Sequence, residues 1–285
     1  MAAAVLFDAP GPKTVARHRV YTVVAAVLVL LAIAYVVMRL HDAGQFDYAL
    51  WEPFVTPNIM QAIGQAWLGT VTMAVLAVLG ALVFGLFFGV AKLSAHKPVR
   101  SAAWLVVEFF RAVPVIMLMI FTFYGIFNSL SIERGAYWSV VLSLTVYNGA
   151  VLAEVFRAGV NALPRGQAEA AYAVGMRKTQ VMRLVLLPQA VKIMIPAIIS
   201  QCIVALKDTS LGFYVLAPGL TTVGRSIWIE FGNQLQTALV LSAIYIICNL
   251  ILTALATWAQ RRLVGERKPI IHTAEPGMEQ GGPVL

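Results

Sequence analysis

The stretch PRGQAEAAYAVGMRKTQVMRLVLLP, residues 164–188, is polar and charged although apolar segments lie on both sides of it. Its charged side chains make insertion of the whole stretch into a bilayer costly. The pattern is nevertheless helical, because Pro164 suits a first helical turn, the alanines are good helix formers and Gly175 can interrupt the run. The stretch therefore predicts a short helix, a glycine turn and a second short helix up to Pro188. Held at a membrane surface, these would form a projection that another protein could bind.

Composition indicates a membrane protein, since 60% of the 285 residues are hydrophobic and only 12% are charged. Residues 20–38 contain no charge and are long enough to span a bilayer. The run is too long for a signal peptide, and no small-residue cleavage site follows it. We therefore expect a retained first helix, and further spans are expected at 62–91, 102–127, 136–156, 189–206 and 237–259. Residues 208–236 are expected to be a loop with a re-entrant or interfacial helix.

The expected organisation has four parts. A polar N-terminal tail covers 1–19, an extra N-terminal transmembrane helix 20–40, and the main transmembrane domain 60–262. The tail 263–285 mixes prolines and glycines with charges and is expected to be disordered. Within the main domain, Pro114 is expected to kink the third span, and the pair Gly85 and Gly89 favours close helix packing more than a dimer contact.

The basic residues indicate the orientation. Six spans place both termini on one side, and most lysines and arginines lie on that side, in the two tails, in 92–100 and in 164–188. The opposite loops offer only Arg39, Arg134, Lys207 and Arg225. Positively charged loops remain cytoplasmic, so both termini and the 164–188 loop are expected in the cytoplasm. The net charge of +8 is then a topology signal, aided by anionic lipid, and not a sign of nucleic-acid binding.

No catalytic residues and no metal site are expected. The sequence has no GxxxxGK[ST] phosphate loop, and its four histidines are too scattered to bind a metal together. No serine lies in a recognisable catalytic motif, and Cys202 and Cys248 lie inside apolar segments where packing is their expected role. The chain is thus not expected to be an enzyme, and the energy for any transport must come from a partner or a gradient.

Charged residues within or beside the spans are the remaining candidates. Glu108 and Arg111 lie three apart on one helix face, as do Glu154 and Arg157. The first pair is interpreted as an intrahelical pair near the cytoplasmic interface. Glu154 lies deeper in its span and is a functional candidate, because ionisable groups inside membranes are costly. Candidate residues of a substrate path are Asn148, Glu154, Arg111 and Lys207, although Lys207 could equally be a hydrated helix end.

Three motifs resemble a known family. Glu169-Ala170-Ala171, then Gly175, then Val185 and Leu187-Pro188 resemble the EAA loop of ABC importer permeases, with valine where isoleucine is usual. Phe110 to Pro114 looks like the FR-x-x-P of amino-acid permeases, and residues 206–211 resemble the LKxTSL segment of the same branch. The three motifs occur in the order typical of the family, and the resemblance covers about residues 60–262. The extra first helix and the opening residues 6–13 are most similar to the second permease of actinobacterial glutamate importers.

The resemblance implies an all-α, multi-pass protein of the bacterial plasma (inner) membrane with six transmembrane helices, the type I ABC importer permease fold and a cytoplasmic coupling helix. It implies a heterodimer with a second permease subunit, a cytoplasmic ABC ATPase dimer that binds ATP and Mg, and an extracytoplasmic solute-binding protein. The imported solute would be a polar amino acid, with glutamate favoured. The residues implied in ATPase coupling are Arg165, Gly166, Glu169, Ala170, Ala171, Gly175, Leu187 and Pro188.

Two other classes of protein are alternatives. A gradient-driven secondary amino-acid transporter would commonly show internal repeats with charged sites in mid-span, and no such repeat is visible. A membrane-embedded enzyme would need a clustered His, Asp or Cys set, which the sequence does not show.

Overall fold

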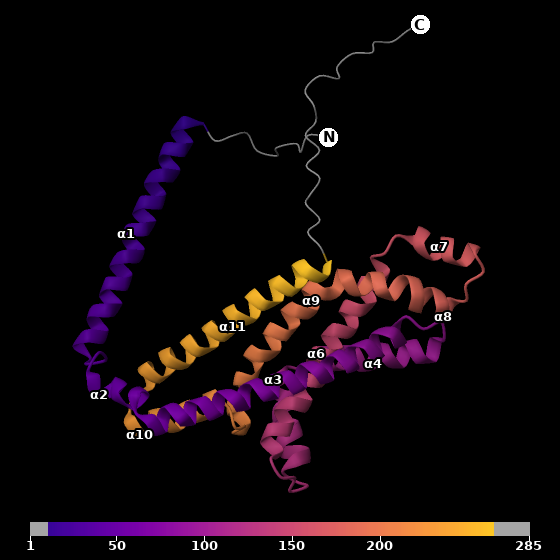
Figure 1. Ribbon diagram of the computed structural model, residues 1–285. Coiled ribbons are helices and arrows are strands. Elements are labelled where there is room, and N and C mark those ends of the chain that lie inside the picture. Colours follow the sequence, from indigo (N-terminus) through magenta and orange to yellow (C-terminus); the bar gives the residue numbers. More distant parts are fainter. Residues whose placement is uncertain (1–10, 265–285) are drawn as a thin grey trace. The chain divides into compact units, whose positions relative to one another are not determined.

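A computed structural model describes residues 11–264, and within that range every regular element is a helix (Figure 1). The elements, with η for 3-10 and π turns, are α1 (Pro12–Asp42), α2 (Tyr48–Trp51), η1 (Glu52–Val55), α3 (Pro57–Lys92), α4 (Lys97–Ala112), α5 (Val115–Ile120), η2 (Phe121–Phe127), α6 (Gly135–Asn161), α7 (Arg165–Ala173), α8 (Lys178–Gln180), η3 (Val181–Leu186), α9 (Leu187–Asp208), η4 (Thr209–Val215), α10 (Leu220–Phe231) and α11 (Gln234–Val264).

The described residues divide into two units, residues 11–46 and residues 47–264. In the first unit the structure describes α1, which begins at Pro12 and not at Val20 as expected. Proline favours a first helical turn, and the basic residues that follow it are tolerated on an exposed helix. The tail predicted over 1–19 is therefore partly helical, and most of the motif at 6–13 lies outside the described residues.

In the second unit, α3 packs most extensively against α6. Glycines allow this approach: a Cβ added at Gly85 would lie 2.7 Å from the Cβ of Leu152, and one at Gly89 would lie 2.8 Å from the Cβ of Phe156. The Gly85/Gly89 pair thus serves packing inside the chain, as the sequence favours. Beside it, the fully buried Leu152 joins Ala190 and Met194 of α9 in one apolar cluster.

Within residues 11–264, five helices are long and apolar enough to span a membrane, and a sixth candidate is the pair formed by α4 with α5–η2. This pair is bent by 98°, so the single kinked span expected over 102–127 is wrong in its geometry. The chain is extended at Val113 and Pro114, because a residue before proline is disfavoured in the helical region and proline cannot donate a backbone hydrogen bond.

The segment after the quoted loop also differs from the expectation. The helix that starts at Lys178 continues to Val215 without interruption, so the second short helix and the span at 189–206 are one element. Pro188 does not end it because proline is tolerated in the first turn of α9. Within residues 208–236 the structure forms η4 and α10, and the Leu220 N–H at the start of α10 donates to Thr70 Oγ1 of α3 at 3.0 Å.

Candidate functional site

The glycine turn after α7 has the geometry of a Schellman helix end. Gly175 N–H donates to Tyr172 O at 2.9 Å, and Met176 N–H donates to Ala171 O at 3.2 Å. Gly175 has φ +82°, a left-handed conformation in which a Cβ is unfavourable. No atom lies within 4 Å of the place where its Cβ would be, so glycine is required there by the backbone and not by lack of space. The turn predicted at Gly175 is therefore confirmed.

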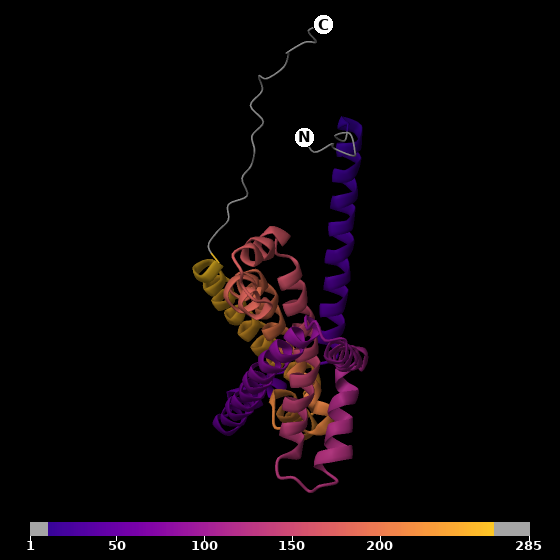
Figure 2. The same ribbon diagram turned by 90° about the vertical axis from the view of Figure 1, so that its right-hand side faces the viewer.

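Helix α7 has a packed side and an exposed side. Ala171 is buried at 6% exposure, and α7 packs against η3, as both views show (Figure 1, Figure 2). Gln189 Nε2 of α9 donates to Gln167 Oε1 of α7 at 3.3 Å. Toward the outside, Tyr172 is 47% exposed and Val174 78%. Of the residues implied in coupling, those exposed on α7 and its glycine turn are Arg165, Gly166, Glu169, Ala170 and Gly175.

The other three implied residues are placed differently. Ala171 faces inward, while Leu187 and Pro188 lie in the first turn of α9. Leu187 lines a groove that also contains Leu93 and His96 from the α3–α4 connection. The basic loop 92–100 and the loop 164–188 therefore lie at the same end of the second unit. This arrangement agrees with the sequence-based assignment of both loops to one side of the membrane.

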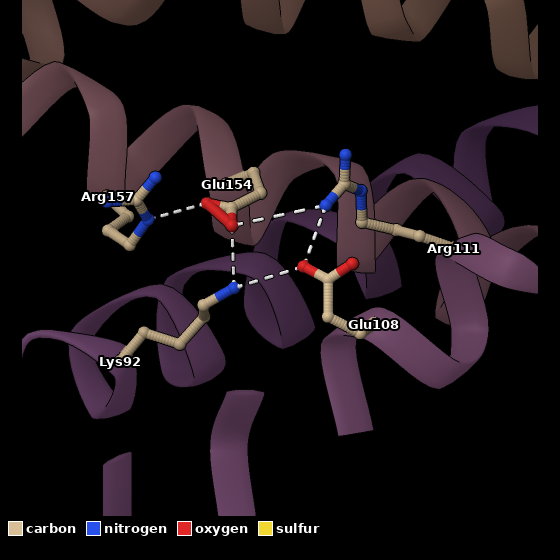
Figure 3. Close-up of polar contacts among 5 residues, drawn as sticks. All are labelled: Lys92, Glu108, Arg111, Glu154 and Arg157. Carbon is tan, nitrogen blue, oxygen red and sulfur yellow. Dashed lines mark hydrogen bonds and ion pairs between the residues drawn. The ribbon is translucent and has the colours of Figure 1, made fainter. Parts of the chain in front are cut away.

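Five charged residues from α3, α4 and α6 meet in an ionic cluster, defined as Lys92, Glu108, Arg111, Glu154 and Arg157 (Figure 3). Glu154 lies at its centre: Lys92 Nζ donates to Glu154 Oε1 at 2.6 Å, and Arg157 Nε donates to Glu154 Oε2 at 2.6 Å. Arg111 Nη1 lies 2.9 Å from Glu108 Oε1 and 4.0 Å from Glu154 Oε1. The distance from Lys92 Nζ to Glu108 Oε1 is 3.7 Å.

This cluster goes beyond the two intrahelical pairs that the sequence predicts. Both pairs form, but Lys92 joins them, and its side chain is only 4% exposed. A buried ammonium is tolerated only where carboxylates and hydrogen bonds compensate for its lost hydration. The cluster therefore ties the end of α3 to α4 and α6. Sequence reasoning missed Lys92 because it was assigned to a basic loop, and its one signal was a lysine directly after an apolar span.

The four candidates for a substrate path lie in three environments. Glu154 and Arg111 belong to the ionic cluster. Asn148 is buried on α6, where its Nδ2 donates to Leu144 O at 2.9 Å and its Oδ1 accepts a hydrogen bond from Gln201 Nε2 of α9. Lys207 is exposed in the last turn of α9. Gln201 was also missed from the sequence, where a glutamine within an apolar span was the available signal.

This fold and this exposed loop define a membrane-embedded permease component. A family model for the binding-protein-dependent transport system inner membrane component matches residues 81–265, and the chain belongs to that family. This match confirms the family expected from the EAA-like loop. Members of the family are membrane subunits without an enzymatic activity of their own. Among residues 11–264, no group of three or more His, Cys, Asp or Glu side chains could hold a metal ion.

Individual relatives are similar over most of the chain. The glutamate transport system permease protein GluD of Corynebacterium glutamicum is 37% identical over 244 residues, which cover 84% of this chain and 89% of the relative. The arginine transport system permease protein ArtQ of Bacillus subtilis is 29% identical, covering 68% and 89% of the two chains. Among solved structures, a crystal structure of an amino acid ABC transporter with histidines is similar at a TM-score of 0.67 and 28% identity, covering 72% of this chain and 95% of that one.

Proposed function

We propose that this chain is one transmembrane permease subunit of an ATP-driven importer of polar amino acids, with glutamate as its solute. The observation that carries the proposal is the exposed helix α7, which ends in a glycine turn and is anchored by Ala171 and Gln167 to the span that follows. Such a rigid, exposed helix suits the transfer of motion from an ATPase to the spans. The 37% identity to a glutamate permease supports the choice of solute.

The partners follow from this proposal. Two copies of a cytoplasmic ATPase would bind ATP and Mg, a second permease would complete the transmembrane pair, and an external binding protein would deliver the amino acid. Glu169, Ala170 and the apolar tip formed by Tyr172 and Val174 would contact the ATPase, because they are exposed on α7 and its turn. Closure of the ATPase dimer on ATP would then move α7, and with it the helix that runs on from Lys178.

The substrate path is proposed along α6 and α9. Lys207 is the cation best suited to the carboxylate of the solute, because it is exposed at the end of α9, whereas Arg111 is already held by Glu108 and Glu154. Asn148 and Glu154 would lie further along α6. Replacing Lys207 with Gln would raise the glutamate concentration needed for half-maximal uptake if the residue contacts the solute. Unchanged affinity would remove Lys207 from the site.

Co-purification of the ATPase in detergent tests the coupling surface. We expect Glu169→Lys and Gly175→Asp each to reduce recovery of the ATPase, the first through the surface charge and the second through the turn. Glu52→Lys is the matched control, since it reverses an exposed charge outside the loop. Equal recovery with all variants would remove α7 from the coupling surface.

Uptake into proteoliposomes tests the solute and the energy source. With binding protein, second permease and ATPase present, glutamate uptake should require ATP and persist when ion gradients are collapsed. Uptake that follows an ion gradient without ATP would favour the secondary transporter.

A further inference from the structure

A polar pocket of about 470 Å³ lies beside the ionic cluster, between the start of α4 and the ends of α3 and α6. Its lining residues are Lys92, Lys97, Arg100, Ser101, Trp104, Glu154 and Arg157. Of these residues the proposed function uses only Glu154, and it leaves the four cations of the pocket without a role.

The pocket carries an excess of positive charge. Four of its lining residues are cations and one is an acid. Glu154 is shared between Lys92 and Arg157, each at 2.6 Å. Lys97 and Arg100 form no ion pair within residues 11–264, where the pairs of 4.0 Å or less all involve other basic residues. Two exposed cations therefore face the pocket without a carboxylate to neutralise them, so an anion is the ligand that fits it.

Helix α4 adds to this positive potential at its start. Lys97 is its first residue, and its first turn contains no acidic side chain. The N-terminus of a 16-residue helix carries a partial positive charge from its aligned peptide dipoles. The helix end, Lys97 and Arg100 thus act on the same pocket.

The sides of α4 indicate where this pocket lies relative to the membrane. Ala103 and Val107 are buried against the other helices, while Leu105 is 63% and Phe109 57% exposed. Trp104, which lines the pocket, is 54% exposed. A helix with an exposed apolar side and a basic polar side that carries a tryptophan is typical of the membrane interface, at the level of lipid headgroups.

We propose that this pocket binds the phosphodiester headgroup of an anionic phospholipid from the cytoplasmic leaflet, with Lys97 and Arg100 as its charged contacts. The choice of leaflet rests on the orientation indicated by the basic loops, and that leaflet is the anionic one. The bound phosphate compensates the excess charge beside Lys92 and holds the start of α4 against α3 and α6. A zwitterionic lipid lacks the net charge that the pocket requires.

Native mass spectrometry of the assembled transporter tests this site directly. The complex is titrated with phosphatidylglycerol and, separately, with phosphatidylcholine of the same acyl chains. Wild type should prefer phosphatidylglycerol, and Lys97→Gln with Arg100→Gln should weaken that binding about tenfold, since each basic residue near an anionic leaflet contributes substantially to lipid attraction. Phosphatidylcholine binding should not change.

A double variant of α1, Lys13→Gln with Arg17→Gln, is the matched control, because it removes the same charge from exposed positions outside the pocket. It should retain the preference for phosphatidylglycerol. Equal affinity of wild type and the pocket variant overturns the proposal. An equal loss in both double variants also overturns it, because the attraction would then be a property of total charge.

Two soluble anions test whether the pocket binds a lipid headgroup or any small anion. Inorganic phosphate and glutamate are each added without lipid, and thermal unfolding is followed in wild type and in the Lys97→Gln, Arg100→Gln variant. Similar melting shifts in both proteins agree with a lipid site. A shift confined to wild type identifies a soluble-anion site and overturns the lipid proposal. ATP-driven glutamate uptake in phosphatidylcholine vesicles tests the proposed function separately, since it does not require an anionic lipid in the assay.

Discussion

At the scale of single residues, Gly175 is needed for its backbone conformation alone. Gly175→Ala should lower the free energy of unfolding by about 1 to 2 kcal/mol, because φ +82° is unfavourable for a residue with a Cβ. Gly166→Ala is the matched control: it lies in α7 with open space around its Cβ position, and alanine favours a helix over glycine by about 1 kcal/mol. Thermal unfolding of both purified variants should move in opposite directions. A Gly175→Ala protein as stable as the wild type would contradict the prediction that a Cβ strains this turn.

The Asn148–Gln201 contact is a second residue-scale feature, because it joins α6 to α9 through a part-buried polar pair. Removing one partner leaves the other without its hydrogen bond, at a cost of about 1 to 3 kcal/mol. A double-mutant cycle of Asn148→Ala and Gln201→Ala should therefore give a coupling of about 1 kcal/mol. Additive effects on unfolding would show that the hydrogen bond contributes nothing to the packing of the two helices.

At the scale of elements, the ionic cluster joins three helices, and its two carboxylates are not equivalent. Glu154→Gln removes the partner at 2.6 Å from the buried Lys92 and should destabilise the protein by about 2 kcal/mol, below the cost for a fully buried pair. Glu108→Gln changes a more exposed carboxylate at 3.7 Å from Lys92 and should cost less than about 1 kcal/mol. Melting temperatures of the two variants measure the difference, and the reverse order would place the centre of the cluster at Glu108.

The close packing of α3 on α6 predicts that the glycines of α3 differ in how much stability is lost when each is replaced by alanine. Gly85→Ala would place a Cβ 2.7 Å from the Cβ of Leu152 and 3.1 Å from the backbone oxygen of Gly149. The helices must then separate, which costs about 1 to 3 kcal/mol. Gly64→Ala is the control on the same helix, since nothing lies within 4 Å of its Cβ position. Thermal unfolding that is equal in the two variants would contradict a tight contact between α3 and α6.

The elements also show what sequence reasoning can and cannot reach here. The turn at Gly175 was predictable because its signals, alanines followed by glycine, lie within one short stretch. The ionic cluster was not, because Lys92 and Glu154 are 62 residues apart and meet only after α3 packs on α6. The bend after Ala112 was predicted only as a kink, since Pro114 indicates a break in the helix but not the 98° change of direction.

At the scale of the whole molecule, each connection between spans must lie on a side of the membrane that is consistent with the others. Figure 1 and Figure 2 place α7 and the connection between η2 and α6 at opposite ends of the second unit. The basic loops favour a cytoplasmic α7, so the η2–α6 connection would be external. The bent pair α4 with α5–η2 must then cross the membrane despite its break. In the described part of the chain, the number of candidate spans, five or six, depends on this one pair.

Cysteine labelling in intact cells tests that crossing. In a background with Cys202→Ser and Cys248→Ser, which removes both native cysteines, His96→Cys reports the exposed connection before α4 and Leu130→Cys the exposed one after η2. A membrane-impermeant maleimide should label Leu130→Cys directly and His96→Cys only after permeabilisation, because the bent pair separates them across the bilayer. Labelling of both from the same side would show that the pair does not cross. Labelling in the opposite order would show that the orientation is the reverse of the expected one, and α7 could then not reach a cytoplasmic ATPase.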